Sequence, residues 1–184
     1  MSTFYTRTGD DGLTGLLGKD RVLKSDLRIE TVGCIDEANA ALGMARSISN
    51  SPDSSTVIQV QRDLYAIMGE VAATPENTKR FRVIGADHVT WLEAQIDRIS
   101  ALVEIPREFI TPGDSPASAA FDMARSIVRR AERRLVELAS RGDVENPDLQ
   151  RYLNRLSSLC FVMELYEIKL AGNEKTTLMK VKKP

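Results

Sequence analysis

Apolar residues recur at every third or fourth position through five long segments, and this spacing constrains the fold more than any other feature of the chain. It is the repeat of an amphipathic α-helix, whose apolar positions line one face. The segments cover residues 27–49, 57–73, 87–103, 116–142 and 147–172. No stretch shows the alternation that a half-buried strand requires, and aromatic residues make up only 5% of the chain. The sequence therefore predicts an all-α fold, a five-helix up-and-down bundle.

Residues with strong helix-end preferences stand between these segments. Ser115 followed by Pro116 predicts an N-cap and a first helical position, and Pro147 predicts the start of the last helix. Asp87 is the expected N-cap of the third helix. We expect residues 75–85, which follow the second helix, to be irregular.

Length and charge set further bounds. A chain of 184 residues suits a single domain over 1–184, divided into a glycine-rich loop at 1–26, a helical bundle at 27–172 and a basic tail at 173–184. The formal net charge is -1, which provides no global attraction for nucleic acid or acidic lipid. A site for an anion must therefore be a local cluster of positive charge.

The two cysteines and the N-terminal residues bear on where the protein works. Cys34 and Cys160 are too few for a disulfide framework, and their apolar helical settings predict buried, reduced thiols. The N-terminal residues contain no apolar core of a signal peptide, and no stretch approaches the length of a membrane span. We expect a cytoplasmic protein without a membrane or nucleic-acid partner.

The stretch from residue 6 to 24 places a glycine at every third position from 9 to 18. Glycine lets backbone amides approach a ligand closely, and the threonine hydroxyls and basic side chains of this stretch suit phosphate oxygens. The spacing is not that of the familiar phosphate loop, because Lys19 is followed by Asp20. Two interpretations stay open, a site for a phosphorylated ligand and a flexible arm rich in turn residues.

The fourth helical segment carries five arginines between positions 125 and 134 against one acid, Glu132, a local charge of +4. Arg125, Arg129 and Arg133 are four residues apart and share a helix face. One interpretation is a solvated face whose arginines pair with Glu132 and Glu137. The other is a polyphosphate clamp, because planar guanidinium groups match phosphate oxygens two at a time.

Asp36 and His88 are two further candidates for functional residues. Asp36 lies on an apolar helix, where partial burial would require a cationic partner, and Arg125 is a candidate in the same chain or across an oligomer interface. His88 is the one histidine and stands at a helix start, which predicts a surface or cap-proximal role. A Ser/His/Asp or Cys/His nucleophile is therefore not expected. Trp91 is expected to pack in the core.

Three blocks of the sequence together resemble the PduO-type ATP:cob(I)alamin adenosyltransferases, a family of corrinoid adenosyltransferases. They read "TRTGDDGLTGLLGKDRVLKSD" through "GCIDEANAALG", then "FITPGDSPASAAFDMARSIVRRAERR", then "RYLNRLSSLCFVM". The resemblance implies a homotrimeric helical bundle with active sites between subunits and an ordered nucleotide loop at the N-terminus. The positions that it assigns to ATP are Thr6, Arg7, Thr8, Gly9, Thr14, Gly15, Lys24, Arg129, Arg130, Glu132, Arg133 and Asn154.

The resemblance also implies the reaction, in which cob(I)alamin attacks C5′ of ATP, with Mg²⁺, to give adenosylcobalamin and triphosphate. Arg129, Arg125, Asp36 and Phe109 are implied to be catalytic, with Asp36 and Arg125 paired across the interface and Phe109 against the corrinoid. No protein ligand to a metal is implied. A cob(II)alamin reductase and an adenosylcobalamin-dependent enzyme are the implied partners. The alternative is a non-catalytic ATP- or corrinoid-binding regulator or carrier on the same fold.

The chain departs from the family pattern at three places. The family turn usually reads Pro-Gly-Gly, whereas this chain has Asp114 at the third position. Asp122 stands where relatives often carry histidine, and the tryptophan that many relatives place near the end is missing. The nucleotide positions match the pattern, so the departures concern the corrinoid side of the site.

Overall fold

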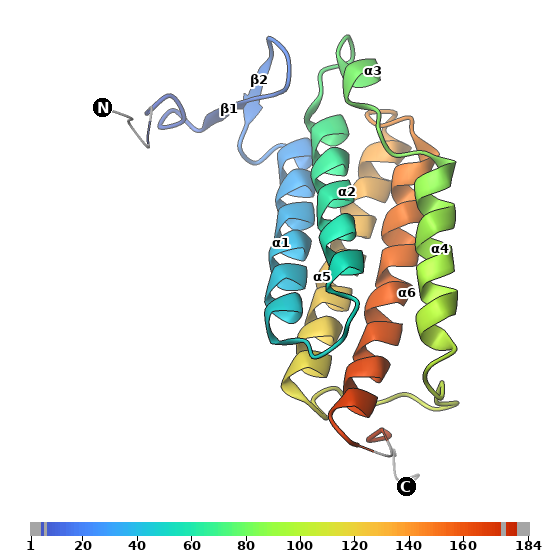
Figure 1. Cartoon of the computed structure of the whole chain (residues 1–184). Helices are drawn as coiled ribbons and strands as arrows, with labels where there is room; N and C mark the ends of the chain where they lie inside the picture. The colour runs from blue at the N-terminus through green and yellow to red at the C-terminus, as the bar shows by residue number, and fades with distance from the viewer. Residues whose placement is uncertain (1–4, 6, 174–175, 180–184) are drawn as a thin grey trace, which may run out of the picture.

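The computed structural model describes residues 5, 7–173 and 176–179, and five long helices dominate this part of the chain (Figure 1). They match the five segments predicted from apolar spacing, so the predicted bundle is confirmed. None of the described helices is long and apolar enough to cross a membrane. The long helices are α1 (Leu27–Ile48), α2 (Ser54–Ala72), α4 (Ala86–Ser100), α5 (Pro116–Ser140) and α6 (Pro147–Leu170).

The long helices alternate in direction along the chain (Figure 1). Helix α1 packs against α2 and α5, α5 packs against α6, and α4 packs mainly against α6 rather than against α5, the next long helix along the chain. The connection from α4 to α5, residues 101–115, therefore crosses the end of the bundle that lies opposite the start of α1 (Figure 1).

The helices enclose one apolar core, to which α5 contributes Val128 and Leu135. Cys34 and Cys160 are free and buried in this core, as predicted. Burial raises the pKa of the Cys160 thiol to about 12, so the thiol stays protonated. Trp91 is partly buried and packs on the core, as expected.

Two of the three predicted helix starts are confirmed, those of α5 and α6. Ser115 Oγ accepts a hydrogen bond from the Ser118 N–H at 3.1 Å and caps α5, and α6 begins at Pro147. The prediction that Asp87 caps α4 is wrong, because the extended backbone of Gly85 makes that residue the N-cap. The Gly85 N–H donates to Nδ1 of His88 at 3.4 Å, which confirms the cap-proximal role predicted for the histidine.

The prediction that the chain contains no strand is wrong for the glycine-rich stretch. Strands β1 (Leu13–Gly15) and β2 (Arg21–Leu23) pair in an antiparallel hairpin, with Leu13 opposite Leu23. Each strand has three residues, which is too short for an alternating pattern to be recognised in the sequence. A short helix, α3 (Thr78–Phe81), lies in the segment that we expected to be irregular.

Candidate functional site

The hairpin surrounds a cavity of about 390 Å³, and most of the residues around it are ones that the sequence assigned to a phosphorylated ligand. At Gly9, an added Cβ would lie 3.0 Å from Nζ of Lys24, so the glycine leaves room for the ammonium group. The structure thus brings hydroxyls, backbone and a cation to one concave surface. The lining residues are Thr8, Gly9, Leu13, Thr14, Gly15, Arg21 and Lys24.

Arg21 and Asp11 hold the hairpin in this shape. The Arg21 guanidinium donates to Oδ2 of Asp11 at 3.1 Å, to the Leu13 carbonyl at 3.3 Å and to the carbonyl of Thr8. The Leu13 N–H, and then the Arg21 guanidinium, hold the pKa of Asp11 below its ordinary value. The sequence analysis counted Arg21 only among the basic side chains of this stretch, because Arg21 and Asp11 meet only when the strands pair.

The tip of the hairpin docks on the end of α2. The Leu17 N–H donates to the Ala72 carbonyl at 2.8 Å, and the Leu17 carbonyl accepts from the side-chain amide of Asn77 at 3.0 Å. At Gly18, an added Cβ would lie 2.2 Å from Oγ1 of the buried Thr74. Only glycine permits this close approach, so Gly18 fixes where the hairpin sits on the bundle.

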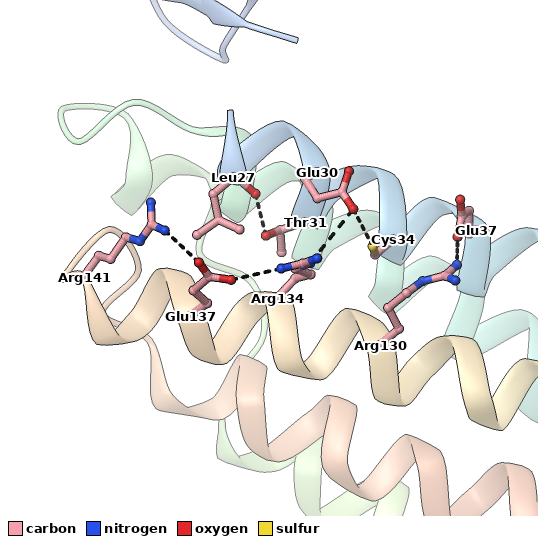
Figure 2. Close-up of polar contacts among 9 residues, drawn as sticks. All are labelled: Leu27, Glu30, Thr31, Cys34, Glu37, Arg130, Arg134, Glu137 and Arg141. Atoms are coloured by element: carbon pink, nitrogen blue, oxygen red, sulfur yellow. Dashed lines mark hydrogen bonds and ion pairs between the residues drawn. The ribbon is translucent and has the colours of Figure 1, made fainter. Parts of the chain in front are cut away.

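Four of the five arginines of α5 divide into two groups, of which the first faces α1 (Figure 2). Arg130 pairs with Glu37, and Arg134 lies 4.0 Å from Glu30. Arg134 also pairs with Glu137 at 3.1 Å. We call this set of contacts the α1–α5 seam. The interpretation of a face whose arginines pair with Glu132 and Glu137 is correct for Arg134 with Glu137, and it is wrong for Arg130, which pairs with Glu37 of α1. The nucleotide contact assigned to Arg130 stays a prediction.

Arg129 and Arg133 form the second group and are exposed on α5. Neither has an ion pair or a side-chain hydrogen bond with any residue that the structure describes. Glu132, between them, accepts a hydrogen bond from the side-chain amide of Asn154 on α6 at 2.8 Å instead of pairing with either arginine. Two guanidinium groups one helical turn apart are therefore left open to an anion.

The structure places Asp36 and Arg125 apart from one another. Asp36 is exposed on α1, so the expectation of partial burial is wrong, because neighbouring Ile35 takes the core position. Arg125 pairs within its own helix, where Nη2 and Nε donate to Oδ1 of Asp122 at 2.6 and 3.0 Å. A pair between Asp36 and Arg125 of one chain is thus not formed, and a pair across an interface stays a prediction.

Glu164 of α6 is an unpartnered charge beside this arginine. Its side chain is buried, with 1% exposure, and neither Oε atom has a hydrogen-bond partner among the described residues. Burial, and then the Asp122 carboxylate, raise the pKa of Glu164 to about 7, while Arg125 lowers it. The one signal of this site in the sequence is that Glu164 stands one turn after Cys160 on the apolar face of the helix.

Phe109 lies on the connection between α4 and α5, at the opposite end of the bundle from the hairpin (Figure 1). Its side chain is 86% exposed. Arg107 and Glu108 beside it line a cavity of about 780 Å³, together with the end of α6 and residues 176 and 178. The 25 residues of α5 span about 37 Å at 1.5 Å per residue, so one chain does not bring Phe109 to the hairpin cavity.

The family model for cobalamin adenosyltransferases matches residues 4–167. The chain belongs to the cobalamin adenosyltransferase family. Its N-terminal hairpin and the arginines of α5 both lie inside the matched range, as does Phe109. The family expected from the three sequence blocks is thereby confirmed.

Relatives named as corrinoid adenosyltransferases support the same membership. The chain is 40% identical over 161 residues to the corrinoid adenosyltransferase PduO of Salmonella typhimurium, a match that covers 86% of this chain and 48% of that protein. It thus spans about half the length of that relative. It is 39% identical over 171 residues to a corrinoid adenosyltransferase of Mycobacterium tuberculosis, covering 89% of this chain and 87% of the other.

Solved structures of adenosyltransferases share the fold. A variant PduO-type ATP:corrinoid adenosyltransferase from Lactobacillus reuteri, complexed with cobalamin and ATP, superimposes with a TM-score of 0.88 at 32% identity. The match covers 97% of both chains. A second variant of that enzyme, complexed with ATP, gives a TM-score of 0.85 at 29% identity.

Some residues near the two termini of the chain lie outside the part that the structure describes. Thr6 lies outside the described residues, as do residues 180–184 of the basic tail. Arg7 has a positive φ of 61° and its guanidinium lies over the ring of Tyr5, 5.5 Å from the centroid. Among the described residues of this adenosyltransferase-family chain, no three His, Cys, Asp or Glu side chains form a group that could hold a metal ion.

Proposed function

We propose that this chain transfers the 5′-deoxyadenosyl group of ATP to the cobalt of a reduced corrinoid, cob(I)alamin, and releases triphosphate. The observation that carries the proposal is the pair of unpartnered arginines, Arg129 and Arg133, in a chain of this family. Relatives named corrinoid adenosyltransferases and the ATP and cobalamin complexes of a structural neighbour support it. We propose that residues 1–184 act as one domain.

The basic side chains act on the leaving triphosphate. As C5′ transfers, negative charge builds on the triphosphate, and guanidinium groups already in place stabilise it without reorganising. Arg129 and Arg133 supply these donors from α5, and Lys24 and the backbone of Gly9 and Gly15 hold the phosphates from the hairpin. Mg²⁺, which neutralises phosphate charge, would enter on the triphosphate, because the described residues form no metal-binding group of their own.

The nucleophile is the cobalt of the substrate, so the protein need not supply a general base. This agrees with a chain whose one histidine caps a helix and whose cysteines are buried. The task left to the protein is alignment, which requires the reacting atoms to be held about 3–3.5 Å apart. Phe109 lies against the corrinoid in this proposal and excludes an axial ligand from one face of the cobalt.

A complete site needs a second copy of the chain. The hairpin cavity contains no residue of α5, and Phe109 lies at the far end of the bundle. We therefore propose an oligomer with its sites between subunits. The family resemblance indicates a homotrimer, in which Asp36 of one copy faces Arg125 of the next. Arg125 would then share its guanidinium between Asp122 and Asp36. Sedimentation of the purified protein tests the assembly.

An anaerobic assay tests the activity. Chemically reduced cobalamin, ATP and Mg²⁺ are incubated with the protein, and we expect a light-sensitive alkylcobalt product together with inorganic triphosphate in equal amounts. A transferase of known activity under the same conditions is the positive control. Binding of ATP or corrinoid without turnover would instead indicate a regulator or carrier on this fold.

The partners follow from the same chemistry. A reductase must supply the Co(I) state, and an adenosylcobalamin-dependent enzyme must consume the product. We therefore propose these two classes of enzyme as partners.

A further inference from the structure

The stretch that carries Phe109 is held by a segment close to the C-terminus. The Met179 N–H donates to the Phe109 carbonyl at 2.8 Å, and the Thr111 N–H donates to the Thr177 carbonyl at 2.8 Å. Between these two bonds, Ile110 and Leu178 form an antiparallel bridge. Among the described residues, these are the only backbone hydrogen bonds that residues 104–113 make.

Asp114 fastens the C-terminal segment to the start of α5. Its Oδ2 accepts from the Thr177 N–H at 2.8 Å, and its Oδ1 accepts from the Thr177 hydroxyl at 2.6 Å. The Asp114 carbonyl also accepts from the side-chain amide of Asn173 at 2.9 Å. One residue therefore binds both Asn173, which follows α6, and Thr177. Hydrogen bonds to an ionised carboxylate are stronger than neutral ones.

We propose that Asp114 is a positioning residue for the corrinoid side of the site: by binding Thr177 it holds residues 176–179 against residues 109–111 and so fixes the direction of Phe109. The inference rests on the proposed function, because it takes Phe109 to contact the corrinoid. Asp114 itself does not contact the substrate.

The exposure of Phe109 explains why its backbone matters. A side chain that is 86% exposed has almost no packing to orient it, so its direction depends on the peptide groups on either side. On its C-terminal side, the Phe109 carbonyl and the Thr111 N–H both bind the segment that Asp114 holds. The same segment supplies Thr176 and Leu178 to the wall of the 780 Å³ cavity. Releasing it would free Phe109 and open that wall together.

Hydrogen exchange of the full-length protein without substrate tests the fastening step. In Asp114→Ala we expect the amides of Thr177, Met179 and Thr111 to exchange at least tenfold faster than in the wild type, with amides of α5 and α6 unchanged. Thr177→Val, which removes the hydroxyl but keeps the N–H, gives a smaller increase, and Thr177→Ser restores the wild-type rate. Unchanged exchange at Thr177 in Asp114→Ala would overturn the proposal.

Steady-state kinetics tests the positioning step. In Asp114→Ala we expect the KM for cob(I)alamin to rise about tenfold while the KM for ATP and the melting temperature stay within error. A merely structural role would move all three or none of them. Faster exchange at Thr177 with an unchanged corrinoid KM would overturn the proposal.

The two proposals can fail separately. If the wild type has no transferase activity, the proposed function is wrong and the claim that Asp114 positions a corrinoid site falls with it. The exchange experiment would still decide whether Asp114 holds the segment, because it needs no substrate.

Discussion

The α1–α5 seam and the exposed side chains of Arg129 and Arg133 use one residue type in opposite ways. We call Arg130 and Arg134 the paired row, and Arg129 and Arg133 the unpartnered row. In the seam, Arg130 and Arg134 lie beside acids of α1 and α5 (Figure 2). One residue earlier along the helix in each case, the guanidinium has no partner in the described part of the chain. A rotation of about 100° per residue separates the two rows. Helix packing, and not residue type, decides which arginines remain available to an anion.

The largest effect should come from the unpartnered row. Arg129→Ala should lower kcat/KM for adenosyl transfer by about 10²–10³, or roughly 3–4 kcal/mol, because it removes a donor aimed at charge that develops in the transition state. The melting temperature should not change, since Arg129 makes no bond within the described chain. Anaerobic kinetics and thermal unfolding measure the two quantities.

Arg134→Ala is the matched control for that experiment. It removes the same side chain from the same helix but from the paired row, and transfer should stay within a few-fold of wild type. Equal losses in Arg129→Ala and Arg134→Ala would show that the two rows do not differ in function.

Glu164 extends the comparison to an unpartnered charge that is buried instead of exposed. Its pKa is raised to about 7 from an ordinary value of 4.5, so the folded state keeps a proton that the unfolded state has already released. Stability must therefore fall as the pH rises from about 4.5 to 7, and the full cost is present above pH 7. Glu164→Gln should be more stable than wild type by about 3 kcal/mol at pH 8, since each pKa unit corresponds to about 1.4 kcal/mol.

Urea unfolding at several pH values measures this difference. At pH 4 the two proteins should have similar free energies of unfolding, because the carboxyl group is protonated in both states. A gain in Glu164→Gln that is the same at pH 4 and pH 8 would mean that a charge is not its cause.

Gly18→Ala tests whether the hairpin holds the ATP whose phosphates are proposed to bind Arg129 and Arg133. The new Cβ would collide with Thr74, so the hairpin must shift on α2. ATP should bind about tenfold more weakly, or about 1.4 kcal/mol. Titration calorimetry measures the affinity. Gly33→Ala, on α1 with open space around its Cβ, is the control and should bind ATP normally.

The smallest effect should come from the paired row itself. A double-mutant cycle between Arg134 and Glu137, which lie 3.1 Å apart and are both partly exposed, should give a coupling of about 0.2–1 kcal/mol in stability. The coupling should weaken with added salt. A coupling above 2 kcal/mol would mean that the seam stabilises the bundle far more than surface ion pairs do.

Several parts of the site were beyond prediction from local sequence. The bonds of Arg21 to Asp11 require two three-residue strands to pair, and such strands leave no periodic signal. The bonds of Asp114 to Thr177 join residues 63 positions apart. The pairing of Asp122 with Arg125 is different, because it follows from their spacing of three on α5 and was open to prediction from the sequence.

The amino-acid sequence by itself determined the five long helices, the N-cap at Ser115, the helix start at Pro147, the glycine-rich stretch and the ladder of arginines. These features depend on neighbours within about four residues, because helix hydrogen bonds and capping are local. Only the tertiary structure decided which arginines lie against acids of α1, where Glu164 is buried and how far Phe109 lies from the hairpin. Those outcomes depend on which helix faces meet, and long-range packing sets that choice.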